Sequence, residues 1–155
     1  MKRTDLYSCF ARQFALDRME PMGPCDDARI NRIEDALETM LPCSYREFLT
    51  RCGPLFVPRL SDSIEHTELG INLVREFFTP EEVVRDTRLY WSGGMPSDFI
   101  GIASDGCGNM FGFRREQART DDSPVLFFDH DFVSVKQDAD AFDSWLARFL
   151  NEVPA

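Results

Sequence analysis

Residues that support common catalytic and metal sites are scarce in this sequence of 155 residues. His66 and His130 are the only histidines, and no G-x-S-x-G motif lies near either of them, so a catalytic triad would have to assemble from unrelated loops. The five cysteines are odd in number and form no C-x-x-C pair, which argues against a zinc site and against a disulfide framework. We therefore expect a protein that is not an enzyme and that binds no cofactor and no metal.

Positive charge is also scarce, because 17 lysines and arginines face 27 aspartates and glutamates, giving a net charge of -10. Such a chain repels the phosphates of nucleic acids, and a cationic partner fits its electrostatic field better. No apolar run approaches the ~18 residues of a membrane span. Polar residues interrupt the first apolar stretch before an export signal could form. We expect a cytoplasmic protein that binds neither nucleic acid nor a membrane.

One glycine-containing stretch, FIGIASDGCGNMFGF (residues 99–113), has some features of a phosphate-binding loop. A dinucleotide fingerprint needs G-x-G-x-x-G between a strand and a helix, whereas these glycines follow G-x-G-x-x-x-G and lead into another apolar, aromatic run. Asp105-Gly106 between two apolar runs is typical of a β-hairpin, because both residues tolerate the φ angles of tight turns. The stretch therefore predicts two strands and a turn.

Helices are predicted toward both ends of the chain and strands in its middle. Apolar residues recur at helical spacing over residues 6–14, 30–41 and 142–149, and the charged residues of the second segment lie mostly away from its apolar stripe. Residues 56–78, 99–113, 125–128 and 132–135 have the composition of strands and turns. This order favours the α+β class: a single domain with a central, largely antiparallel β-sheet packed with helices near both ends of the chain.

Helix boundaries are predicted from residues that satisfy free backbone groups. A further helix is expected from Pro80 to about Leu89. Gly53 is expected to end an earlier helix, which begins at Ser44. The expected caps are Asp26 or Asp27, Ser44 with Glu47, Thr79 with Glu82, and Asp138 or Asp140. Residues 1–24 are expected to form an N-terminal extension, a short helix and a loop, before the main domain of residues 25–155.

Three blocks of the sequence resemble the SUKH superfamily, which includes fungal cell-wall-synthesis regulators and many bacterial immunity proteins. They are IEDALETMLPCSYREFLTRCG, FIGIASDGCGNMFGF and PVLFFDHDFVSVKQDADAFDSWLARFL, in the family's order. Cys52 stands where the family commonly has asparagine before glycine, so the end of that helix is expected to differ locally. The resemblance implies an immunity protein that neutralises a cognate toxin. The alternative it implies is a non-catalytic regulatory scaffold.

A cationic toxin, such as a nuclease with a basic cleft, would bind carboxylates that mimic phosphate. The candidate partner-binding residues are carboxylates in loops beside predicted strands and two aromatic residues before a glycine-containing loop. They are Asp105, Asp121, Asp122, Asp129, Asp131, Tyr90 and Trp91. The alternatives are solvated turns for the carboxylates and core packing for the aromatic residues. A metal site at Asp129-His130-Asp131 is disfavoured, because strand alternation points His130 away from both carboxylates unless the turn reorients them.

Overall fold

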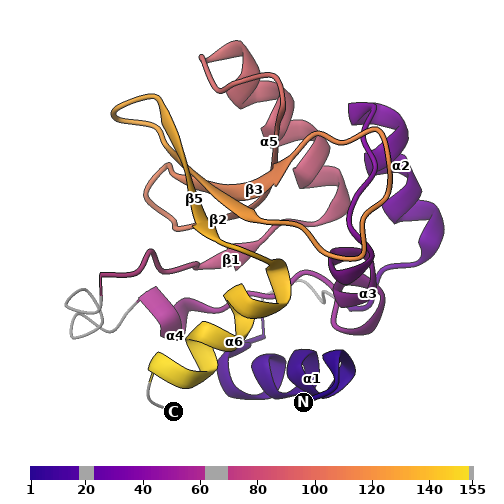
Figure 1. The fold of residues 1–155 in the computed structure, drawn as a ribbon, viewed down its shortest axis with the longest axis vertical. Coiled ribbons are helices and arrows are strands. Elements are labelled where there is room, and N and C mark those ends of the chain that lie inside the picture. Colours follow the sequence, from indigo (N-terminus) through magenta and orange to yellow (C-terminus); the bar gives the residue numbers. More distant parts are fainter. Residues whose placement is uncertain (18–22, 62–69, 154–155) are drawn as a thin grey trace.

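The structure, a computed structural model, describes residues 1–17, 23–61 and 70–153. Five antiparallel strands form one sheet in the order of the sequence, with helices on both faces (Figure 1). The strands are β1 (Glu76–Phe77), β2 (Phe99–Ser104), β3 (Met110–Arg114), β4 (Val125–Asp129) and β5 (Ser134–Ala139). The α+β class and the antiparallel sheet predicted from the sequence are confirmed.

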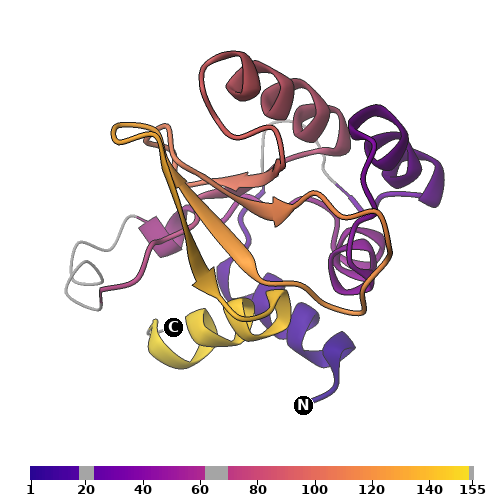
Figure 2. The ribbon, with the colours of Figure 1, turned by 45° about the horizontal axis from the view of Figure 1, so that its top comes forward.

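The helices form two groups around the sheet (Figure 2). They are α1 (Arg3–Phe14), α2 (Asp27–Leu37), α3 (Cys43–Arg51), the short α4 (Pro58–Ser61), α5 (Pro80–Ser92) and α6 (Phe142–Glu152). Helix α5 packs on β2 and is flanked by α2, whereas α1 and α6 pack on each other below the opposite face. Helix α5 continues three residues beyond the predicted end at Leu89.

An aromatic core joins α6 to the sheet. The predicted apolar face of α6 is completely buried. The ring centroid of Trp145 lies 5.1 Å from that of Phe111 and 5.8 Å from that of Phe77. Helix α1 contributes to the same core, because Tyr7 and Phe10 are also completely buried and contact rings of α3, α6 and β1. The helix expected near the N-terminus is therefore present and shares the core of the sheet.

Two predicted helix starts are confirmed. Asp26 accepts a hydrogen bond from the backbone of Arg29 at the start of α2. Thr79 and Glu82 form the expected reciprocal capping box at the start of α5. Gly53 adopts a φ of 72° just after α3, as a glycine at a helix end should, while Cys52 stays right-handed with a φ of -106°. The left-handed position thus falls on glycine, and Cys52 carries no backbone strain.

The predicted capping box of Ser44 and Glu47 is wrong. Ser44 lies inside α3, whose N-cap is Pro42, and its hydroxyl donates a 2.8 Å hydrogen bond to Asp122. The backbone N–H groups of Cys43 and Ser44 donate to carbonyls of Thr120 and Asp121 instead. The start of α3 is therefore satisfied by a segment distant in sequence.

The predicted caps of α6, Asp138 or Asp140, are also wrong. The N-cap is Ala141, and the free N–H groups of Phe142 and Asp143 donate to the carboxylate of Asp122. Asp138 instead accepts from the indole of Trp145 and from the guanidinium of Arg148, one and two turns into the helix.

Two predicted strand regions differ from the structure. In the described part of residues 56–78, only Glu76–Phe77 forms a named strand, residues 58–61 form α4, and residues 62–69 lie outside the described residues. Phe132 and Val133 were expected to begin the last strand but lie in a loop of four residues, because Asp129 pairs with Ser134 across the hairpin. The longer loop leaves both apolar side chains outside the sheet.

Candidate partner-binding site

Three segments converge at one end of the sheet and form a surface that we call the loop corner. It comprises the end of α5 and the residues after it (90–95), the β2–β3 turn (105–109) and the β4–β5 turn (129–133). Both hairpin turns project at the same end of the sheet in Figures 1 and 2. Five of the seven candidate residues lie in these segments: Tyr90, Trp91, Asp105, Asp129 and Asp131.

The β2–β3 turn is organised by the carboxylate of Asp105. One oxygen accepts from the backbone N–H groups of Cys107 at 2.8 Å and Asn109 at 3.1 Å, and the other accepts from the side-chain amide of Asn109 at 2.7 Å. Gly106 and Gly108 have φ values of 80° and 97°, which glycine adopts without a steric penalty. The glycines therefore turn the chain, as the hairpin prediction required.

The two hairpin turns are fastened to each other through Asn109 and His130. The side-chain oxygen of Asn109 accepts from the backbone N–H of His130 at 3.0 Å and pairs with ring Nδ1 at 2.9 Å. Because that oxygen can only accept, Nδ1 carries a proton in this arrangement. The imidazole lies against Gly108, where a Cβ atom would approach ring Cε1 to 2.7 Å. The two hairpin turns thus form one packed unit within the loop corner.

The β4–β5 turn is held by Asp129 and carries an unusual backbone angle. One carboxylate oxygen of Asp129 accepts from the N–H groups of Asp131 at 3.0 Å and Phe132 at 3.2 Å. Val133 has a φ of 50°, a conformation that a β-branched residue rarely adopts. Phe132 and Val133 are 81% and 55% exposed. The turn therefore presents two apolar side chains to solvent.

The turn also brings the possible ligand atoms of Asp129, His130 and Asp131 within 4.8 Å of one another. The strand alternation that would separate them does not apply, since all but Asp129 lie in the loop. Their positions are accounted for by the hydrogen bonds of the turn and by the 3.3 Å contact between His130 Nε2 and Asp131. Within the described residues, nothing beyond this proximity indicates a metal site.

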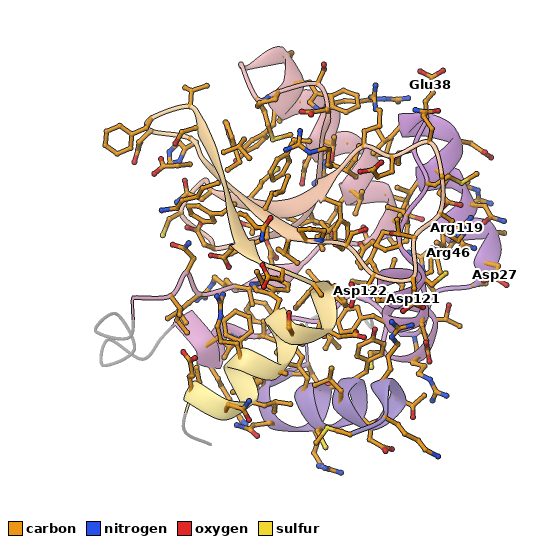
Figure 3. The ribbon with its side chains drawn as sticks, viewed as in Figure 1. Asp27, Glu38, Arg46, Arg119, Asp121 and Asp122 are labelled. Carbon is orange, nitrogen blue, oxygen red and sulfur yellow. The ribbon has the colours of Figure 1, made fainter. Side chains whose placement is uncertain are left out.

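Asp121 and Asp122 lie away from the loop corner, near the start of α3 and α6 (Figure 3). The carboxylate of Asp122 serves as an acceptor within the fold. The carboxylate of Asp121 is exposed and pairs with Arg3 at 2.9 Å, and this hydrogen bond with Arg3 lowers the pKa of Asp121. The seven candidate residues thus do not form one surface.

Tyr90 and Trp91 support the corner and the sheet from α5. The hydroxyl of Tyr90 donates to the carbonyl of Gly108 at 3.0 Å, and burial raises its pKa, with the charges of Asp86 and Asp105 adding to the effect. The indole of Trp91 donates to the carbonyl of Phe99 at 2.8 Å, and the guanidinium of Arg115 lies 4.8 Å from its ring centroid. Both side chains are half-buried, so their most evident contacts are internal.

Exposed Phe132 and Val133 are the corner residues that the sequence reasoning missed as candidates. Their run DFVSV has the alternating apolar pattern of a strand, and that pattern places them in the sheet. The acidic residues just before Phe132 indicate a turn, but they do not show that the loop continues through Val133.

A buried ion cluster around Glu34 lies on the other side of the molecule, where Figure 3 labels its partners Arg46 and Arg119. The carboxylate of Glu34 is 9% exposed and binds Arg46 at 2.9 Å, Arg119 at 2.8 and 3.0 Å, and the backbone N–H of Leu41 at 2.8 Å. Burial alone would raise the pKa of Glu34, but these hydrogen bonds and the two guanidinium charges outweigh it and lower the pKa. The cluster fastens the segment 115–124 to α2 and α3.

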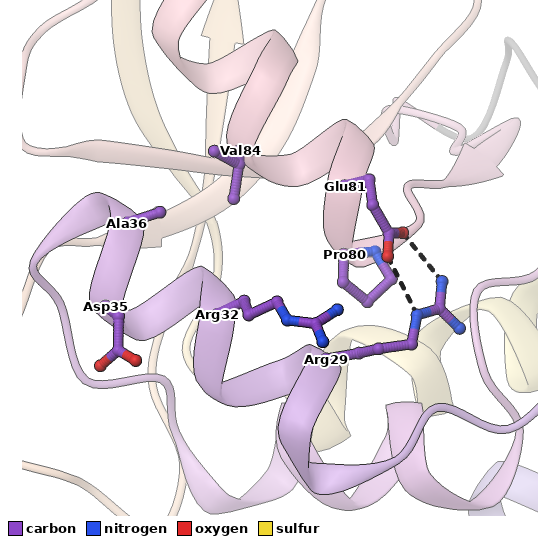
Figure 4. A pocket seen from close by; sticks show the side chains of 7 residues that line it. All are labelled: Arg29, Arg32, Asp35, Ala36, Pro80, Glu81 and Val84. Atoms are coloured by element: carbon purple, nitrogen blue, oxygen red, sulfur yellow. Dashed lines mark hydrogen bonds and ion pairs between the residues drawn. The ribbon is translucent and has the colours of Figure 1, made fainter.

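The surface also has a groove of about 580 Å³ between α2 and α5 (Figure 4). Its lining residues are Arg29, Arg32, Asp35, Ala36, Pro80, Glu81 and Val84. Arg29 and Glu81 bridge the helices through hydrogen bonds of 2.8 and 3.0 Å, and the hydrogen bond from Arg29 lowers the pKa of Glu81. Its two walls are joined by this ion pair, and the side chain of Arg32 extends toward the same end of the groove.

None of the helices in the described ranges has the length and apolar character needed to cross a membrane. The architecture defines the class: an α+β domain in which a five-stranded antiparallel meander lies between helices. The chain belongs to the SMI1/KNR4 family (SUKH-1), whose family model matches residues 24–148. Comparison with curated proteins gives no match. The resemblance to the SUKH superfamily is thus confirmed, and α1 lies outside the matched range.

Proposed function

We propose that this chain is an immunity protein that binds a cognate toxin in the cytoplasm and blocks it without any chemistry of its own. Family membership supports this role, because the superfamily includes bacterial immunity proteins as well as regulators. The observation that carries the proposal is the loop corner, where carboxylates from two hairpins are fixed on one surface. Fixed turns at a sheet end lose little conformational freedom on binding.

The charge of the chain indicates which toxins fit. A net charge of -10 attracts a cationic partner and speeds encounter with it. A nuclease has a basic cleft for phosphate, and carboxylates such as Asp131, whose side chain is 75% exposed, would occupy that cleft in place of substrate. Asp105 and Asp129 would contribute charge while they hold their turns.

Survival of cells tests the proposed role. A cognate toxin domain should kill cells when expressed alone, and coexpression of this chain should restore growth and yield a complex that copurifies. Continued killing at normal levels of folded protein would contradict immunity and favour the regulatory scaffold instead.

Charge reversal at one position tests the role of the corner. Asp131→Lys should slow association with the toxin by roughly tenfold and reduce its dependence on salt, because an attractive charge becomes repulsive. Stopped-flow or surface-binding kinetics at several salt concentrations would measure this. Asp121→Lys changes the net charge equally but lies away from the corner, so its association rate should stay close to that of the unmodified protein. Equal slowing by both variants would exclude the corner as the contact surface.

A further inference from the structure

Phe132 is distinguished from the other aromatic side chains by its exposure. The residue is 81% exposed, and it is the only aromatic residue among the exposed large hydrophobic residues of the described chain. The chain has 14 phenylalanines, and most of them lie in the core. The free energy falls when a partner covers a large apolar ring that was exposed to water. Aromatic residues commonly contribute most of the binding energy at interfaces.

The turn fixes where Phe132 stands before any partner binds. Its backbone N–H donates to Asp129, the next residue adopts the strained φ of 50°, and the preceding His130 is fastened to Asn109 of the other hairpin. Strained backbone persists where surrounding contacts impose it, and such positions cluster at binding sites. A ring presented on a backbone that is already ordered loses less freedom on binding than one on a mobile loop.

The groups around Phe132 define the chemistry of the partner. Asp131 directly precedes it with a carboxylate that is 75% exposed, and Asp129 and Asp105 lie in the same corner. A second copy of the chain carries the same net charge of -10, and an anionic membrane is also negative, so both would repel these carboxylates overall. A cationic protein surface would pair with them.

We propose that Phe132 is the apolar anchor of the loop corner and inserts into a hydrophobic pocket of the toxin that is rimmed by lysine or arginine. Val133 covers one side of that pocket, and Asp131 pairs with a cation on its rim. This inference rests on the proposed immunity function and adds to it the residue and the partner surface that hold the complex together.

Binding of the purified toxin domain to Phe132 variants tests the anchor. Phe132→Ala should raise the dissociation constant by about 30-fold or more, mainly through faster dissociation, because the variant leaves the pocket unfilled. Phe132→Trp should keep most of the affinity. Leu89→Ala removes another exposed apolar side chain, 63% exposed on α5, and should leave affinity unchanged. The thermal midpoint of Phe132→Ala should match that of the unmodified protein, since the ring packs little in the free fold.

Each result has a distinct meaning. If the unmodified protein binds and protects but Phe132→Ala does so equally well, the anchor is wrong and the immunity function stands. If the unmodified protein does not bind, the immunity function itself fails. An equal loss of affinity in Leu89→Ala would also contradict the anchor. Binding of the unmodified protein to vesicles of anionic lipid, lost in Phe132→Ala, would overturn it in favour of membrane docking.

Discussion

Replacing Glu34 by alanine should lower the free energy of unfolding by about 3 kcal/mol. The substitution removes the carboxylate that neutralises Arg46 and Arg119 and accepts the N–H of Leu41. Breaking a buried ion pair from one side leaves uncompensated charge and costs roughly 3–5 kcal/mol. We expect the lower end of this range because the Arg119 side chain is 34% exposed. Chemical denaturation monitored by tryptophan fluorescence would measure the loss.

The same carboxylate should make stability depend on pH. Its pKa is lower in the folded chain than in the unfolded chain, so its contribution is complete above the unfolded pKa of about 4.3. The contribution is lost as the pH falls from there through the folded pKa, and Glu34→Gln should flatten this part of the stability curve.

Asp35→Ala removes an exposed carboxylate from the same helix and serves as the control for Glu34→Ala. Equal losses in Glu34→Ala and Asp35→Ala would contradict the role of the cluster.

Replacing Asp122 by alanine should cost about 2–3 kcal/mol of stability. Its carboxylate accepts from the hydroxyl of Ser44 at 2.8 Å and from three backbone N–H groups at 2.8 to 3.2 Å, two of them at the free start of α6. The variant would leave these donors without an acceptor and would release the segment 115–124 from α3 and α6. Thermal and denaturant unfolding would both report the change.

The neighbouring residue supplies the matched control for Asp122. Asp121→Ala breaks a solvent-exposed pair with Arg3 and should leave the unfolding midpoint nearly unchanged. Asp122→Asn should lose less than alanine does, because asparagine also caps helices well. If Asp121→Ala and Asp122→Ala destabilise the chain equally, the account of the cap is wrong.

Local signals predicted much of this fold correctly. Thr79-Pro80-Glu81-Glu82 contains both halves of a capping box, and Asp105-Gly106 joins two apolar runs, so each pattern carries its own structural cause. The apolar face of α6 followed from its period of 3.6 residues. Such signals depend only on residues within one turn or one hairpin.

Features that depend on distant residues were not predictable from those patterns. Asp122 caps a helix that starts 20 residues later, so no local spacing indicates it. Glu34 was expected with the other charged residues away from the apolar stripe, but Arg119, 85 residues further on, makes its burial favourable. Local charge patterns do not show which cation will approach from another segment.

The candidate site was only partly predictable for the same reason. The sequence identifies acidic loops, but it does not show that the turns at 105–109 and 129–133 meet while Asp121 lies elsewhere. The exposure of Phe132 follows from the length of one loop, which the register of β4 and β5 determines.

Titration of the toxin's activity with this protein tests the central claim, that it neutralises by occupying a surface, most directly. Activity should fall in proportion to the protein added and reach its floor at one equivalent, and intact toxin should recover its activity when the two are separated. Inactivation that continues with time at far less than one equivalent, or a toxin that stays chemically altered after separation, would show that the chain acts as a catalyst.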